Sequence, residues 1–137
     1  MCGITGFLVH PGRHGAVEAE NTALAMARAI ARRGPDSFGA WTDPEAGIAF
    51  GHRRLAILDL SPAGHQPMSS PSGRYVICYN GEIYNHLDLR AELEAAGRAS
   101  SWRGHSDTET LVAGFDAWGV EATISRAVGM FAIAVWD

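Results

Sequence analysis

The second residue of the chain combines two groups that can do chemistry together. Once Met1 is removed from the start Met1-Cys2-Gly3, Cys2 carries both a thiol and a free α-amine. An N-terminal nucleophile uses such a pair, because the amine can take the proton as the sulfur attacks, and no histidine is needed. The residue types therefore predict covalent acyl transfer from Cys2. A cysteine behind the first methionine also occurs by chance, so the rest of the chain has to decide.

Acyl transfer also needs hydrogen-bond donors for a developing oxyanion and groups that hold the rest of the substrate. Asn80 and Gly81 offer a side-chain amide and a backbone N–H, and a glycine lets the backbone come close to a ligand. The same Asn-Gly pair is equally the strongest short signal for a tight hairpin turn. Glu82 follows directly and is either a group that binds a substrate ammonium or a solvated turn carboxylate.

Two further positions could bind the charged ends of an amino acid. Arg53 and Arg54 stand in an otherwise apolar strand, where a guanidinium can make a forked contact with a carboxylate. One of the two is expected to be an outward-facing arginine at the strand edge, and the residues alone do not say which. Asp107 could bind an ammonium, although acids are favoured at helix N-termini on electrostatic grounds in any case.

Other kinds of site are not indicated. The six histidines include no pair at i, i+4 on a predicted helix, and no C-x-x-C accompanies them, so no metal site is expected. The sequence has no G-x-S-x-G nucleophile elbow, no phosphate-binding G-x-x-x-x-G-K-[ST] and no dinucleotide fingerprint.

The composition describes an ordinary globular chain. Its 137 residues have room for one domain, 47% of them are apolar, and the net charge is −4 with arginine as the sole basic residue apart from histidine. No basic run favours nucleic acid, and no apolar stretch approaches the roughly 18 residues of a membrane span. Cys78 lies in an apolar run and is expected to be a buried small hydrophobe. A reducing cytoplasm is the expected compartment.

The first half of the chain is expected to be a mixture of strands and one helix. The helix should bury Val17, Leu24, Ala27 and Ala31 on one face and stop at Gly34-Pro35. The expected elements are a strand at 3–9, the helix at 17–32, strands at 37–42 and 48–58 joined by the turn 43–47, and a loop at 61–73.

The second half is expected to contain a hairpin and three helices. Ser106 and Glu109 have the spacing of a capping box, so a helix should begin there, with Leu111, Phe115 and Trp118 on its buried face. The other expected elements are strands at 74–79 and 82–84 around the Asn-Gly turn, helices at 87–96 and 121–126, and a last strand at 130–136. That last strand is apolar on both faces and should be covered on both, which predicts a domain cut short at its C-terminal end.

Five segments together carry a family resemblance. They are Met-Cys-Gly-Ile-Thr-Gly-Phe at 1–7, Arg-Gly-Pro-Asp-Ser at 33–37, Gly-His-Arg-Arg-Leu-Ala-Ile-Leu-Asp at 51–59, Tyr-Asn-Gly-Glu-Ile-Tyr-Asn at 79–85 and Ser-Asp-Thr-Glu at 106–109. The chain resembles, over its whole length, the glutaminase domain of class II glutamine amidotransferases, which are N-terminal nucleophile (Ntn) hydrolases. It is most similar to the glutamine-hydrolysing asparagine synthetases.

The resemblance implies a role for each candidate residue. Cys2 would attack the side-chain amide of glutamine, with Asn80 and Gly81 as the oxyanion hole, and water would then resolve a glutamyl thioester. Arg54 would bind the substrate carboxylate, and Glu82 and Asp107 would bind the α-amine. The backbone of Leu55, Ala56, Ile57 and Leu58 would line the pocket.

The resemblance also implies the architecture. The fold class would be α+β, a four-layer αββα sandwich of two antiparallel sheets flanked by helices, with residues 1–137 forming an incomplete glutaminase domain. The ATP-dependent synthetase domain would be absent, so ATP and Mg are expected only there and no cofactor in this chain. The expected partners are glutamine, a synthetase domain in cis or in trans, and a second copy in a homodimer.

Two alternatives stay open. The domain could serve another ammonia acceptor, such as a sugar phosphate, a phosphoribosyl donor or a peptide, although the spellings at 33–36 and 106–109 favour the asparagine synthetase type. The chain could also be an inactive, truncated interaction module, because an unpaired apolar strand seeks a partner.

Overall fold

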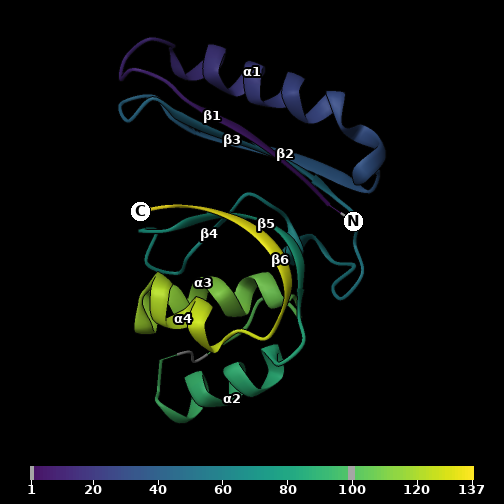
Figure 1. The fold of residues 1–137 in the computed structure, drawn as a ribbon, viewed down its shortest axis with the longest axis vertical. Coiled ribbons are helices and arrows are strands. Elements are labelled where there is room, and N and C mark those ends of the chain that lie inside the picture. The colour runs from purple at the N-terminus through teal and green to yellow at the C-terminus, as the bar shows by residue number, and fades with distance from the viewer. Residues whose placement is uncertain (1, 99–100) are drawn as a thin grey trace. The chain divides into compact units, whose positions relative to one another are not determined.

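The structure is a computed structural model that describes residues 2–98 and 101–137. The chain divides into two compact units, drawn in Figure 1. The first unit runs to Ala56 and includes His65–Pro67, and the second consists of Ile57–Gly64 and Met68–Asp137. Each unit contains one three-stranded antiparallel sheet and its own helices, so the α+β class is confirmed.

The first unit is a sheet with one helix along it. The sheet has the order β1-β3-β2, and α1 (Ala16–Ala29) lies along one of its faces, as Figure 1 shows. The strands are β1 (Gly3–Leu8), β2 (Ser37–Asp43) and β3 (Ile48–Arg54), and a 3₁₀ turn at Ala31–Arg33 follows the helix. The register places Gly3 opposite Arg53 and Ser37 opposite Arg54.

The buried face of α1 differs from the predicted one. Ala19, Ala23 and Ala27 are buried at a spacing of four residues, and Ala19 and Ala23 pack with Ala49 of β3. Of the predicted face only Ala27 is buried, and Val17 is 74% exposed. Three alanines let the helix approach the sheet closely, which a face of larger side chains would prevent. The prediction followed the largest apolar residues, whereas the packing selects the smallest.

The third strand is shorter than the sequence suggests. It ends at Arg54 rather than at residue 58, so Leu55, Ala56, Ile57 and Leu58 lie beyond the ladder. Side chains take over the hydrogen bonding there: the N–H of Leu55 donates to Cys2 and that of Ala56 to Asp36. An apolar run alone does not reveal this exchange of partners.

The second unit has helices packed on a sheet of order β4-β5-β6. Its strands are β4 (Met68–Ser69), β5 (Val76–Ile83) and β6 (Gly129–Trp136), and a 3₁₀ turn lies at Pro62–Gly64. Its helices are α2 (His86–Ala95), α3 (Asp107–Trp118) and α4 (Val120–Arg126). Figure 1 shows α3 and α4 against one face of this sheet, with α2 alongside α3.

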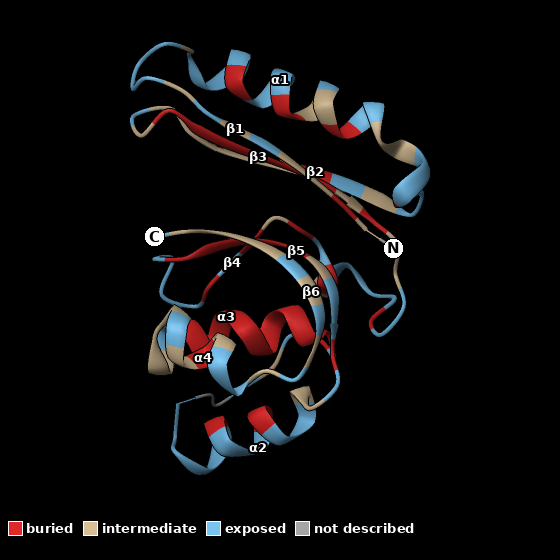
Figure 2. Cartoon of the chain, viewed as in Figure 1, coloured by how far each residue is buried: buried red, intermediate tan, exposed pale blue. Residues whose placement is uncertain are grey.

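The core of the second unit lies between β5 and α3. Ile77, Tyr79 and Ile83 pack with Leu111 and Phe115, as the predicted face of α3 requires. Figure 2 shows α3 as the most thoroughly buried helix of the chain, buried without a break from residue 107 to residue 115. None of the described residues of that stretch faces solvent, although four of them are polar.

The last strand is not covered on both faces. Phe131, Ile133 and Val135 are partly buried against the core, whereas Met130 on the alternate face is 73% exposed. The strand lies at an edge of its sheet, where it pairs with β5. The prediction of a fully buried strand is therefore wrong for the described fold, because residues on an edge strand can be apolar without being enclosed.

The pair Asn80-Gly81 is not a turn. Both residues lie inside β5, opposite Ala132 and Phe131 of β6, and Gly81 is not among the glycines with positive φ. A Cβ at Gly81 would collide with the carbonyl of Met130 and the side chain of Phe131. Glycine stands here because the neighbouring strand comes close, which a search for hairpin signals cannot distinguish from a tight turn.

Half of the predicted capping box forms. The Ser106 hydroxyl accepts a hydrogen bond from the Glu109 N–H at 3.2 Å and begins α3, as predicted. The Glu109 carboxylate instead accepts from the N–H groups of Arg103 and Gly104, at 2.7 and 3.0 Å. The same carboxylate lies 3.5 Å from the guanidinium of Arg90 on α2. Glu109 therefore forms a buried ion pair instead of capping the helix with its side chain.

Candidate active site

The predicted site residues fall into two groups, one in each unit. The first unit contains Cys2, Arg54, Leu55 and Ala56. The second contains Ile57, Leu58, Asn80, Gly81, Glu82 and Asp107. Each group is described within its own unit.

The thiol of Cys2 is held by the backbone of one residue. The Leu55 N–H donates to the Cys2 Sγ over 3.4 Å, and the thiol donates to the Leu55 carbonyl over 3.6 Å. Cys2 and Leu55 lie just past the ends of β1 and β3, which pair from Gly3 and Arg53 onward. The antiparallel register thus brings the start of the chain to a residue 53 positions away. Cys2 is partly exposed, so its sulfur can meet a small molecule.

The segment 33–36 braces this corner, a role that the sequence alone did not indicate. The Arg33 guanidinium donates through Nε to the Cys2 carbonyl at 3.1 Å. The Asp36 carboxylate accepts from the Ala56 N–H at 2.8 Å. The sequence Arg-Gly-Pro-Asp was one of the segments that carried the resemblance, but it predicted no contact with Cys2. Its hydrogen bonds hold the backbone of Cys2 and that of Ala56, the residue next to Leu55.

The two neighbouring arginines have different surroundings. Arg53 donates through Nε to the Gly34 carbonyl at 2.8 Å and lies over the Phe38 ring at 5.4 Å. Gly34 is required there, because a Cβ would collide with the backbone of Arg53 and Arg54. Arg54 is buried and faces the opposite side of the strand from Arg53. Arg53 thus has partners within the protein, and the binding of a carboxylate by Arg54 stays a prediction drawn from the resemblance.

Ile57 and Leu58 lie in an irregular segment of the second unit and are exposed. Asp59, the next residue, holds this segment in place through hydrogen bonds of its carboxylate. One oxygen of its buried carboxylate accepts from the Ser61 N–H and the other from the His105 N–H, each at 2.7 Å. The segment is thereby tied to the turn that precedes α3.

Asn80 and Glu82 point to the same face of β5. Side chains alternate along a strand, and Tyr79 and Ile83 occupy the face that packs on α3. Asn80 and Glu82 must therefore point to the other face, where Met130 of β6 stands opposite Glu82. Glu82 is exposed and Asn80 partly exposed, so both can meet a ligand.

The N–H of Gly81 points away from β6. The N–H of Tyr84 donates to the Val128 carbonyl across that pair of strands, whereas the N–H of Ile83 donates to the Asp107 carboxylate. Successive N–H groups along a strand alternate between its two edges. The Gly81 N–H, two residues before Ile83, is thus directed to the edge of β5 on which Asp107 lies.

Asp107 joins the start of α3 to the end of β5. Its Oδ2 accepts from the Tyr79 hydroxyl at 2.6 Å and from the Ile83 N–H at 2.9 Å, and its Oδ1 accepts from the Thr108 N–H at 2.9 Å. A carboxylate accepts about four hydrogen bonds, so these three donors take most of its capacity. Asp107 thus has a structural role in addition to the predicted binding of an ammonium.

His86 and Cys78 are two titratable groups whose pKa the fold shifts. Burial lowers the pKa of His86, against the opposing charges of Asp107 and Glu82, and its buried Nδ1 has no hydrogen-bond partner among the described residues. Burial raises the pKa of the Cys78 thiol to about 12, as expected for a buried small hydrophobe. Cys78 is therefore unreactive at neutral pH.

The described residues offer no grouping of three or more His, Cys, Asp or Glu side chains that could bind a metal ion. None of their helices is both long and apolar enough to cross a membrane.

Comparison with known proteins places the chain in a family. Residues 1–137 match the family described as glutamine amidotransferase domain. The chain is similar over its full length to asparagine synthetase [glutamine-hydrolyzing] 1 of Bacillus subtilis, with 43% identity, and to asparagine synthetase B [glutamine-hydrolyzing] of Escherichia coli, with 38% identity. It spans 21% and 23% of the length of these relatives.

A solved structure shows a similar fold. Glutamine phosphoribosylpyrophosphate amidotransferase from B. subtilis, complexed with ADP and GMP, superposes with a TM-score of 0.53 at 24% identity. The match covers 67% of this chain and 21% of that one. The sheets, the helices and the family match agree with the resemblance drawn from the five segments. The chain is a member of the glutamine amidotransferase domain family and matches the glutaminase domains of asparagine synthetases.

Proposed function

We propose that this chain hydrolyses glutamine to glutamate and ammonia through Cys2. The supporting observation is the position of the Cys2 sulfur, which is held between the N–H and the carbonyl of Leu55 and remains partly exposed. Cys78, the other cysteine, is buried with a raised pKa and cannot serve as nucleophile.

The proposed reaction has two steps. After removal of Met1, the Cys2 sulfur attacks the side-chain carbonyl carbon of glutamine while the α-amine takes the thiol proton. The tetrahedral intermediate collapses, the C–N bond breaks, and the amine returns the proton to the leaving ammonia. Water then attacks the thioester, with the same amine as base, so that the C–S bond breaks and glutamate leaves.

The remaining site residues bind the parts of glutamine that do not react. The Asn80 side-chain amide and the Gly81 N–H donate to the oxyanion, a role that the outward direction of this N–H supports. Arg54 binds the α-carboxylate, Glu82 and Asp107 bind the α-ammonium, and the backbone of residues 55–58 lines the pocket.

The proposed destination of the ammonia is a synthetase domain, in cis or in trans. The names of the relatives, glutamine-hydrolysing asparagine synthetases, favour aspartate as the acceptor. Residues 1–137 would then supply only the glutaminase half of the reaction. ATP and Mg would be used by the synthetase domain, and no cofactor by this chain.

A glutaminase assay with two cysteine variants tests the proposal. Cys2→Ala should abolish the release of glutamate and ammonia, because the nucleophile is removed. Cys78→Ala is the matched control, since it removes the same atom from a buried site, and its rate should equal that of the parent. Activity in Cys2→Ala, or none in the parent chain, would contradict the proposal.

A further inference from the structure

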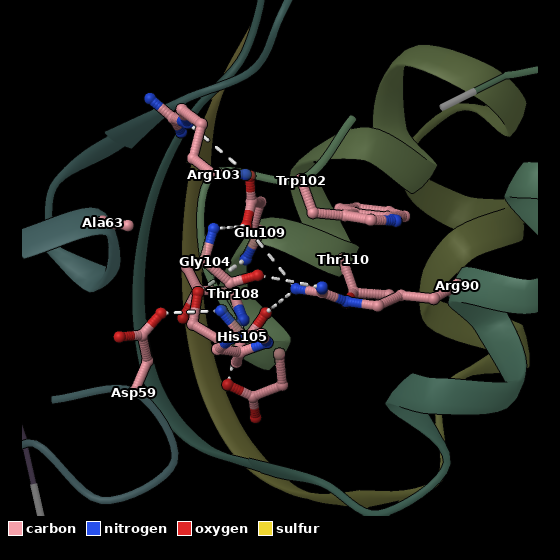
Figure 3. Close-up of polar contacts among 12 residues, drawn as sticks. Asp59, Ala63, Arg90, Trp102, Arg103, Gly104, His105, Thr108, Glu109 and Thr110 are labelled. Atoms are coloured by element: carbon pink, nitrogen blue, oxygen red, sulfur yellow. Dashed lines mark hydrogen bonds and ion pairs between the residues drawn. The ribbon is translucent and has the colours of Figure 1, made fainter. Parts of the chain in front are cut away.

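Arg90 is a buried arginine that none of the proposed roles explains. It lies on α2 and donates from Nε to the Thr110 hydroxyl at 2.8 Å, from Nη1 to the Gly104 carbonyl at 3.0 Å and from Nη2 to the Ser106 carbonyl at 2.9 Å. Its guanidinium also lies against the Trp102 ring, 4.1 Å from the centroid. Figure 3 shows it entering between this ring and the turn before α3.

The turn at 103–106 is held by buried charged side chains. Glu109 accepts from the N–H groups of Arg103 and Gly104, and Asp59 accepts from that of His105. Arg90 donates to the carbonyls of Gly104 and Ser106 and pairs with Glu109 at 3.5 Å. Figure 3 draws these interactions converging on Glu109 and Gly104. The path of the turn therefore depends on the guanidinium and the two carboxylates.

The next residue after this turn is Asp107. Arg90 binds Ser106 immediately before it and Thr110 one turn after it, so the guanidinium grips the chain on both sides of Asp107. The Asp107 carboxylate in turn accepts from the N–H of Ile83, the neighbour of Glu82. A shift of the turn would therefore move one proposed ammonium-binding carboxylate relative to the other.

We propose that Arg90 is a positioning residue that holds Asp107 against the end of β5, so that Asp107 and Glu82 together receive the α-ammonium of the substrate. The proposal rests on the proposed function, because it concerns the same binding site. A guanidinium is needed rather than any cation, since three acceptors at fixed directions and one ring face must be met at once.

A pair of substrates separates positioning from general stability. Glutamine carries the α-ammonium, and 4-carbamoylbutanoate is the same molecule without it. A variant that only loosens the fold lowers kcat/KM for both. A variant that misplaces Asp107 lowers kcat/KM for glutamine alone, so the ratio of the two values falls.

The test compares Arg90→Lys with two controls in the 137-residue chain. Arg90→Lys keeps the positive charge and removes the planar guanidinium with its several donors. We expect the glutamine preference, the ratio of kcat/KM for glutamine to that for 4-carbamoylbutanoate, to fall about tenfold, the equivalent of one charge-assisted hydrogen bond. Arg126→Lys makes the same change at an exposed arginine that also stacks on a tryptophan, Trp118. Leu93→Ala destabilises the same helix from a buried position. Both controls should leave the preference within about twofold, because the leucine side chain has no donor and Arg126 pairs with Glu92 instead.

A second variant keeps the proposal testable if Arg90→Lys does not fold. Thr110→Val removes one of the three acceptors of Arg90, so it should lower the same preference less than Arg90→Lys does, by about twofold to threefold. In the folded variants, amide exchange of Ile83 and His105 should accelerate, because a displaced turn weakens the hydrogen bonds from Ile83 to Asp107 and from His105 to Asp59.

The outcomes distinguish the two proposals. A fall in preference confined to Arg90→Lys and Thr110→Val supports positioning. Equal falls in kcat/KM for both substrates, or no fall, would overturn it while leaving the glutaminase function intact. A parent chain that neither binds nor hydrolyses glutamine would overturn both.

Discussion

In the first unit, the buried face of α1 consists of three alanines, whereas in the second α3 is buried from Asp107 to Phe115 with its polar residues included. The first unit positions Cys2 through strand register and hydrogen bonds with the backbone of Leu55. The second unit holds the turn before Asp107 through a buried network of hydrogen bonds and an ion pair around Arg90 and Glu109. Figure 2 makes the difference visible in the two helices.

This difference has a consequence for substitutions. A register set by a ladder of backbone hydrogen bonds tolerates most single side-chain changes. A network in which each buried charge satisfies others does not, because removing one member leaves the rest unpaired. The second unit should therefore be the more sensitive one.

The largest expected effect is the loss of stability when a large side chain is removed from the core of the second unit. Phe115→Ala should lower the free energy of unfolding by about 3–5 kcal/mol, since a fully buried aromatic side chain is removed. Ala23→Gly, at the buried face of α1, should cost only about 1 kcal/mol, mainly through helix propensity. Urea unfolding measures both. Equal costs would contradict the contrast between the two cores.

The next effect concerns the buried ion pair. Glu109→Gln should lower the free energy of unfolding by about 3 kcal/mol, because the buried Arg90 charge is left without its partner. Glu92→Gln removes a carboxylate from the exposed pair with Arg126 and should cost less than about 1 kcal/mol. Thermal unfolding of the two variants checks the difference, and a Glu109→Gln as stable as Glu92→Gln would refute the network.

A smaller effect, on activity, separates the two arginines of β3. Arg54→Ala should raise KM for glutamine about tenfold to a hundredfold with a weaker effect on kcat, because a charge-assisted hydrogen bond to the non-reacting end is removed. Arg53→Ala removes a guanidinium that binds the Gly34 carbonyl and should raise KM far less. Steady-state kinetics decide, and a fall in kcat with KM unchanged would count against the role of Arg54.

The smallest effect is a pH dependence from His86. Burial lowers its pKa in the folded chain, so below about 6.5, the ordinary value, the unfolded state binds more protons than the folded one. The free energy of unfolding should therefore decrease as pH falls from about 7 through 6.5 toward the lower folded pKa. In His86→Gln this slope should be shallower. Urea titrations at several pH values measure it, and identical slopes would show that His86 does not contribute.

Local patterns predicted those elements whose causes are local. The start of α3 follows from a hydroxyl and an N–H three residues apart, and its buried face from the spacing of Leu111 and Phe115. The end of the helix predicted at 87–96 also has a local cause, because α2 ends at Ala95 and Gly97 follows with a φ of +64°.

The failures share a cause, which is interaction with distant residues. Gly81 is glycine because β6 lies close, not because the chain turns. Arg90 lies within the helix predicted at 87–96, and no local pattern marks its role, because its three acceptors lie 14 to 20 residues away. The bracing role of Arg33 and Asp36 likewise requires Cys2 and Ala56 to be in place. The predicted roles of the site residues in binding glutamine came from the resemblance and remain predictions.

The most direct test is to trap the nucleophile with an electrophilic glutamine analogue and determine the crystal structure of the adduct. We expect a covalent bond from the Cys2 sulfur to the analogue, with the former carbonyl oxygen about 3 Å from both the Asn80 side-chain nitrogen and the Gly81 N–H. An adduct on Cys78, no adduct at all, or an oxygen bound by neither Asn80 nor Gly81 would contradict hydrolysis by the N-terminal cysteine.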